Sequence, residues 1–141
     1  MKAGGSVMTE MYEETQRQKT TLHFKESDLM DSLKALFDLS AEDGETFEYF
    51  KMRTRHEFDM DDSAPRMESG IYVPDVPQGV TEDTMQAQKD LKDVKDKMDD
   101  TMSYHDWVNE KLEAACDVQA YQFNDIKVAE SNPVDDTDAL I

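Results

Sequence analysis

The chain has 141 residues, enough for one domain with one modest hydrophobic core. It carries 33 acidic and 15 basic residues, a formal net charge of −18, which opposes binding of the whole molecule to nucleic acid or to an anionic membrane. No apolar run approaches transmembrane length, and the first residues lack the apolar core of a signal peptide. We therefore expect an intracellular or virion protein.

The N-terminal third of the sequence predicts a flexible arm, a strand and a short helix. Residues 1–19 are polar and are expected to form a flexible arm. Residues 20–25 are rich in β-formers and predict a short strand, with Leu22 and Phe24 on one face. Ser27 is the expected N-cap of an amphipathic helix that ends near residue 39. Its apolar face is formed by Leu29, Met30, Leu33, Leu36 and Phe37.

The next segment alternates between two kinds of residue from position 50 to 61. Period 2 predicts a long strand, beginning near residue 45, with one face on the core and one in solvent. The core face would consist of Phe50, Met52, Thr54, His56, Phe58 and Met60. An acidic loop over residues 61–69, a short strand over 70–73 and a rigid connector between Pro74 and Pro77 would follow.

A long helix is expected from about residue 81 to 120. Thr81 can serve as its N-cap, and Glu82 and Asp83 would face the positive end of the helix dipole. Residues 121–128 allow either a last strand or a continued helix, and we favour the strand. Residues 130–141 are acidic and are expected to form a tail. The predicted fold is α+β: a single domain over residues 20–129 with a small, mainly antiparallel sheet, one short helix and one long helix.

The long helix carries a heptad seam over about four heptads. The seam is weakest near Thr101 and widens after it, where Met102, Tyr104 and Trp107 add to the apolar face. It can pack on the protein's own sheet or helix, or it can meet a second copy or a partner chain, and both interpretations stay open. Its a positions are Thr84, Leu91, Met98, His105 and Leu112, and its d positions are Ala87, Val94, Thr101, Val108 and Ala115.

The chain shows no catalytic, phosphate-binding or zinc motif. Its histidines are far apart in sequence, and we interpret His56 and His105 as half-buried side chains. If His105 faces a second copy, it would form a pH-sensitive joint. The Asp59 region starts like a calcium loop but lacks the required glycine and closing glutamate. We therefore expect no enzyme activity, no cofactor and no metal. Cys116, the one cysteine, is expected to be a small buried hydrophobe.

One basic cluster stands out in this acidic chain. On the predicted strand, Lys51, Arg53 and Arg55 would all face solvent. They can pair with the protein's own acids, or they can dock an acidic surface such as the tail of a neighbouring copy, since residues 130–141 carry four acids and no base.

These features favour a non-enzymatic assembly subunit that binds other copies of itself or other subunits, with a phage head, neck or tail as the setting. The alternative is an acidic inhibitor that mimics nucleic acid and occupies a DNA-binding protein. Neither function requires direct contact with nucleic acid or membrane. The expected interface comprises Leu91, Val94, Met98, Met102, His105, Val108 and Leu112, with Lys51, Arg53 and Arg55.

Overall fold

The computed structural model describes the backbone of residues 3–131 and the side chains of residues 7–117. Three helices account for most of the described backbone: α1 (Ala3–Ser40), α2 (Phe47–Met60) and α3 (Glu82–Ser131). Within these residues there is no strand. The predicted α+β fold with an antiparallel sheet is therefore wrong, and the chain is all-helical over the described part.

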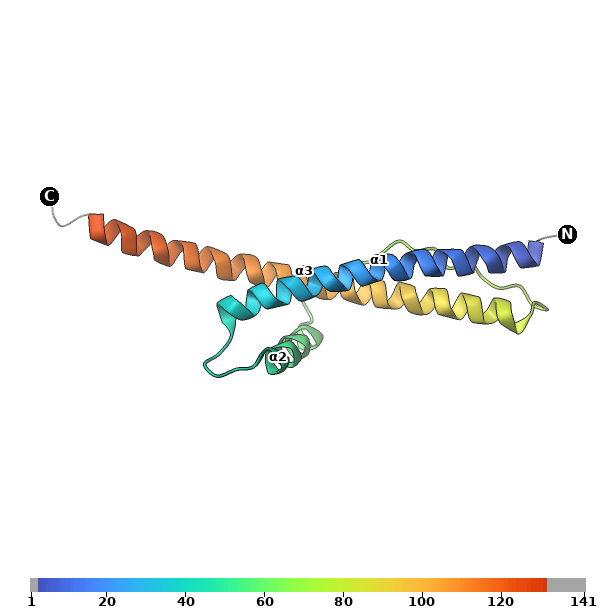
Figure 1. Ribbon diagram of the computed structural model, residues 1–141, viewed down its shortest axis with the longest axis horizontal. Helices are drawn as coiled ribbons and strands as arrows, with labels where there is room; N and C mark the ends of the chain where they lie inside the picture. The colour runs from blue at the N-terminus through green and yellow to red at the C-terminus, as the bar shows by residue number, and fades with distance from the viewer. Residues whose placement is uncertain (1–2, 132–141) are drawn as a thin grey trace.

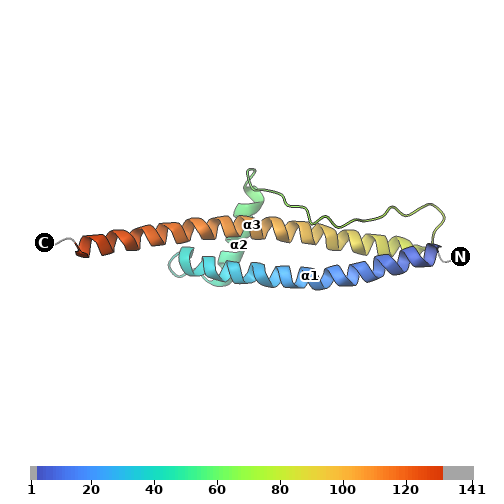
Figure 2. The ribbon, with the colours of Figure 1, turned by 90° about the horizontal axis from the view of Figure 1, so that it is seen from above.

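Two long helices form a rod. Helices α1 and α3 lie side by side and run in the same direction, and α3 continues well beyond the end of α1 (Figures 1 and 2). Two parallel helices cannot be joined by a tight turn. After α1 ends, the chain must therefore return to the other end of the rod before α3 can begin. Helix α2 crosses the pair near the end of α1, and residues 61–81, called here the connecting segment, make the return.

The connecting segment is fastened to α3 by hydrogen bonds along its length. Ser103 Oγ accepts from the backbone N–H of Met67 at 2.7 Å, and the Asp99 carboxylate accepts from that of Ser69 at 2.7 Å. Further on, Gln88 Nε2 donates to the carbonyl of Pro74 at 2.9 Å. The chain therefore runs antiparallel to α3. Residues 70–73 lie in this segment and pair with no other strand among the described residues, which corrects the predicted short strand.

Residues 50–60, predicted as a strand from their alternating pattern, lie in a helix. Apolar residues at every second position also recur at every fourth position, which is the spacing of one helical face. Thr46 caps α2, with its side chain accepting a hydrogen bond from the Tyr49 N–H at 3.1 Å. Among the alternating residues, positions four apart lie on one helical face, and Phe50, Thr54 and Phe58 are the buried ones. The other half of the predicted core face points outward, and Met52 is 69% exposed. Charged residues at the odd positions form ion pairs along the helix, and Arg53 pairs with Glu57 one turn later.

Residues 3–19 of the predicted arm and the whole predicted first strand lie inside α1, and residues 1–2 are outside the described residues. Its seam positions follow a 4-3 spacing from Met11 to Leu36, interrupted by polar residues such as Thr15 and Ser32. Met11 and Thr15 are each 2% exposed, so the N-terminal part packs as tightly as the rest. Thr20 and Thr21 donate to the carbonyls four residues earlier, which helices allow. Tertiary packing has overridden local β-propensity here.

The predicted long helix is confirmed and is longer than expected. Thr81 Oγ1 accepts from the N–H of Thr84 at 3.3 Å, as an N-cap does. The helix runs to Ser131, so residues 121–128 are helical and the favoured last strand is wrong. The tail beyond Ser131 lies outside the described residues.

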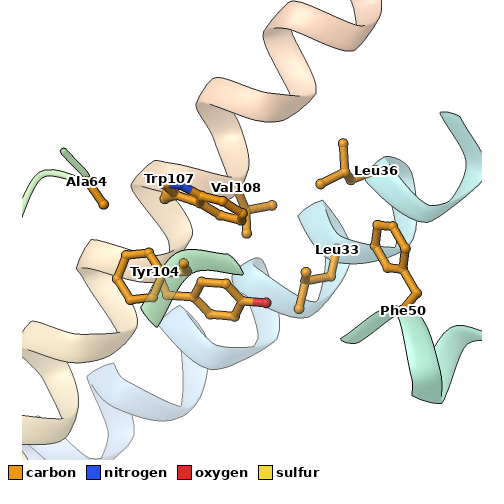
Figure 3. Close-up of a cluster of buried hydrophobic side chains, with 8 residues drawn as sticks. Leu33, Leu36, Phe50, Ala64, Tyr104, Trp107 and Val108 are labelled. Carbon is orange, nitrogen blue, oxygen red and sulfur yellow. The ribbon is translucent and has the colours of Figure 1, made fainter. Parts of the chain in front are cut away.

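The largest core cluster joins all three helices and the connecting segment. Figure 3 shows Leu33 and Leu36 from α1, Phe50 from α2 and Ala64 from the connecting segment gathered around α3. From α3, Tyr104, Trp107 and Val108 fill the centre of the cluster. Phe58 is fully buried beside them, with its ring centroid 5.1 Å from that of Tyr104. This end of α1 therefore packs against both of the other helices.

Candidate protein-interaction surfaces

The heptad seam of α3 is used inside the chain. Leu91, Met98 and Val108 are each at most 1% exposed, and Val94 is 4% exposed. They lie against α1, which follows α3 along most of the rod. Leu112 packs against the core cluster, and Met102 is half-buried. Of the two interpretations of the seam, packing on the protein's own helix is the one seen.

His105 also lies within the chain. Its Nε2 atom is 2.9 Å from Ser32 Oγ of α1, and Ser32 Oγ donates to Asn109 Oδ1 at 3.1 Å. Since the serine proton is directed at Asn109, His105 must donate its Nε2–H to the serine oxygen. The three side chains form a polar layer between α1 and α3. His105 therefore does not depend on a second copy for its partner.

The basic cluster of α2 is neutralised locally. Arg53 makes two hydrogen bonds to the Glu45 carboxylate, at 2.7 and 2.8 Å, and this arginine lowers the pKa of Glu45 to about 2. Arg55 binds Asp100 of α3 through two hydrogen bonds of 2.8 and 2.9 Å. Lys51 pairs with Glu48 at 3.2 Å. All three cations therefore have acidic partners within the chain, which agrees with the interpretation that they pair with the protein's own acids.

Asp61 ties the end of α2 to α3. Its carboxylate accepts hydrogen bonds from the hydroxyl and the N–H of Ser63, at 2.6 and 3.0 Å, and from Trp107 Nε1 at 2.9 Å. The bond from the Ser63 hydroxyl is the main cause that lowers the pKa of Asp61 to about 2, with Trp107 next. Sequence reasoning placed Asp61 in an acidic loop and missed this role. The only local signal was the Asp-x-Ser spacing typical of a turn.

Helix α2 presents a second apolar face to solvent. Tyr49 is 57% exposed, Met52 and Met60 are each 69% exposed, and His56 is exposed between them. Their spacing places them on one side of the helix, opposite the buried face. We call these four residues the outer stripe of α2. A hollow of about 480 Å³ borders this stripe, lined in part by Met52, His56 and Arg55.

A long hollow lies between α1 and the connecting segment. It has a volume of about 710 Å³ and is called here the side groove. Figure 2 shows α3 between the two walls, and Leu91, Met98 and Met102 of α3 line the groove between them. Val7 and Lys25 are the outermost α1 residues that line it. Sequence reasoning missed the groove because the residues of its α1 wall were assigned to an arm and a strand.

Two further predictions concern reactive or metal-binding side chains. Cys116 is exposed on α3, so its prediction as a buried hydrophobe is wrong. His56 is exposed as well, and not half-buried. Among the described residues, no group of three or more His, Cys, Asp or Glu side chains is placed to hold a metal ion. No described helix is both long and apolar enough to cross a membrane.

Comparisons with known proteins add no family or relative. No protein-family model matches the chain, and searches of curated proteins and of solved structures find no match. Function is therefore inferred from the chain's own surfaces.

Proposed function

We propose that this protein is a non-enzymatic assembly subunit that acts through contacts with other copies of itself or with other protein subunits. The observation that carries the proposal is its large exposed surface. The chain exposes 9510 Å². A compact monomer of its mass, 16.2 kDa, would expose about 7,500 Å². The excess of about 2,000 Å² is comparable to what a specific protein–protein interface buries.

The kind of surface exposed supports the same function. Large apolar side chains lie in solvent at the end of the rod where α1 and α3 begin, with Tyr12 at 62% exposure and Met85 at 56%. The outer stripe of α2 gathers three more in one line. Isolated apolar side chains are normal on monomers, but a stripe along one helix face is typical of helix–helix contacts. A large homo-oligomeric particle such as a phage virion is the setting we propose.

The alternative function, mimicry of nucleic acid, draws on the charge of −18 and on the rod shape. The charge arrangement on α3 weakens it. Lys89, Lys92, Lys95 and Lys97 interrupt the acids of α3, and Lys95 is bound to Asp99 at 2.8 Å. A continuous face of carboxylates, which phosphate mimicry requires, is therefore absent from this described stretch of α3.

Light scattering of the purified chain at low salt and at about 0.5 M salt tests the proposal. An assembly subunit held by apolar contacts should form the same defined oligomer at both salt concentrations. The double variant Met52→Ser with Met60→Ser should lower the oligomer fraction. Phe24→Ser, which changes an apolar side chain of similar exposure (63%) on α1 outside the outer stripe, is the control and should leave it unchanged. A monomer at both salt concentrations would contradict self-assembly.

A further inference from the structure

We infer that the side groove binds an extended peptide segment of a partner protein, with apolar residues at alternate positions and a basic residue at one end. This inference rests on the proposed function, since it names the partner that one surface of the subunit accepts. The groove has three different walls, and each of them restricts the occupant.

The length of the groove suits a short extended chain. Its α1 wall runs from Val7 to Lys25, which corresponds to about 27 Å of helix. An extended peptide of about eight residues spans the same length.

The floor of the groove favours apolar side chains. Met98 and Leu91 are each 1% exposed, and Met11 of α1 is 2% exposed, so the floor is closed and well packed. Met102 adds a second flexible thioether from α3. Methionine side chains adapt to different apolar partners, which suits a peptide-binding floor. In an extended peptide every second side chain points the same way, so alternate residues would reach this floor.

The connecting segment supplies the wall that pairs with a peptide backbone. It runs along α3 without helical structure, turns at Gly70, where φ is +80°, and lines the groove with residues from Ser69 to Tyr72 and with Pro74. Its bonds to α3 use the N–H of Met67 and of Ser69. No hydrogen bond within the described part of the chain uses the N–H of Gly70 or of Tyr72. Free backbone groups beside an extended chain are what strand addition requires.

The rim gives the occupant its charge and direction. Glu14 is engaged by Arg17 and Gln18, whereas Glu10 and Glu13 form no ion pair among the described residues. These two free carboxylates lie toward one end of the groove, and Lys25 lies at the other. The separation of Glu13 and Lys25 is about 18 Å along α1, or five to six extended residues. A basic residue at one end of the peptide and a carboxylate at the other match this rim.

The test selects random nine-residue peptides on the full-length protein, immobilised through the exposed thiol of Cys116. The expected winners carry apolar residues at alternate positions and Lys or Arg at one end. The best winner is then synthesised and titrated against two variants. Thr21→Trp fills the groove, whereas Thr20→Trp places the same ring on the exposed neighbour outside it. Both threonines make the same 3.3 Å bond to a helix carbonyl, so the two variants are matched for local stability.

Binding should fall at least tenfold in Thr21→Trp and stay within twofold of wild type in Thr20→Trp. The double variant Glu10→Lys with Glu13→Lys should weaken binding as well. Hydrogen exchange at the N–H of Gly70 and Tyr72 should slow when the peptide binds. No enriched sequence family, equal binding to both tryptophan variants, or winners with helical i, i+4 spacing would each overturn the inference. Light scattering without peptide tests self-assembly separately, so either proposal can fail alone.

Discussion

Trp107 of α3 donates a hydrogen bond from Nε1 to the carboxylate of Asp61, the residue that ends α2, at 2.9 Å. The two residues are 46 positions apart in sequence. The bond fixes the point at which the chain leaves α2 and starts back along α3. Trp107 also packs against Phe58, with ring centroids 5.8 Å apart. One side chain thus holds both the last turn of α2 and the start of the connecting segment.

Replacing Trp107 by Phe should separate these two roles. Phenylalanine keeps an aromatic ring in the cluster but removes the indole N–H. We expect a loss of about 1.5–3 kcal/mol in the free energy of unfolding, the usual net value of a hydrogen bond to a charged group. Trp107→Ala should lose about 3–5 kcal/mol, because it also leaves a cavity. Urea unfolding followed by circular dichroism measures both. A Trp107→Phe variant as stable as the wild type would show that the hydrogen bond contributes nothing.

The stability of the fold should fall in acid. The folded-state pKa of Glu45 and that of Asp61 are each lowered to about 2, from ordinary values of 4.5 and 3.8. The unfolded chain therefore binds protons first, so the stabilisation is complete above about pH 5 and is lost as the pH falls toward 2. The melting temperature of the wild type should exceed that of Glu45→Gln near neutral pH. This difference should shrink between pH 4.5 and pH 2, and a constant difference would contradict the Arg53 pairing.

Residues of the α3 seam should contribute more to the free energy of unfolding than residues of the outer stripe of α2. Leu91→Ala removes a side chain that is 1% exposed, so we expect a loss of about 2–5 kcal/mol in the free energy of unfolding. Met52→Ala removes an apolar side chain that is 69% exposed and should change the free energy by less than about 0.5 kcal/mol. Denaturant titrations at a concentration where the protein is monomeric make the comparison. A similar loss in both variants would mean that the α2 outer stripe is buried in solution.

His105 should occupy the Nε2–H tautomer. Because Ser32 directs its proton to Asn109, only a donated Nε2–H satisfies the serine oxygen. The carbon and nitrogen chemical shifts of the imidazole report the tautomer directly. An Nδ1–H tautomer would reverse the direction of the hydrogen bond and contradict this arrangement.

Cys116 should react with a thiol reagent without unfolding. Its side chain is exposed on α3, past the core cluster. A disulfide reagent should modify the native protein at a rate similar to that of the protein in denaturant. Protection by more than about a hundredfold in the native state would place the thiol in an interface or a core.

The long helix could be predicted from sequence because its signals agree. The cap at Thr81, the acids behind it and the charge pairs along its outer face all favour one helix. The strand predicted over residues 50–61 was wrong because apolar residues at every second position fit a helix as well: they fall on two opposite helical faces. The cap at Thr46 and the Arg53–Glu57 pair were the helical signals in that stretch. A strand there would have needed a partner strand that the chain does not supply within its described residues.

The surfaces were harder to predict than the helices. The α3 seam was found from its heptads, but its partner on α1 is broken by Thr15, Ser32 and other polar residues that hide the period. Without α1 as a helix, neither the side groove nor the polar layer at His105 can be placed. Both depend on contacts between residues far apart in sequence, such as the 73 positions between Ser32 and His105. Local patterns carry no information on such distances.

The parallel arrangement of α1 and α3 has a consequence for synthesis of the chain. A helix hairpin can close as soon as its second helix emerges, but Ser32 must wait for a residue 73 positions later. At ribosomal speeds of roughly 5–20 residues per second, this wait is about 4–15 s. During that time Leu22, Leu33 and Leu36 have no partner from α3. The nascent chain should therefore be a substrate for chaperones, and its folding should be slower than that of other all-helical proteins of its length.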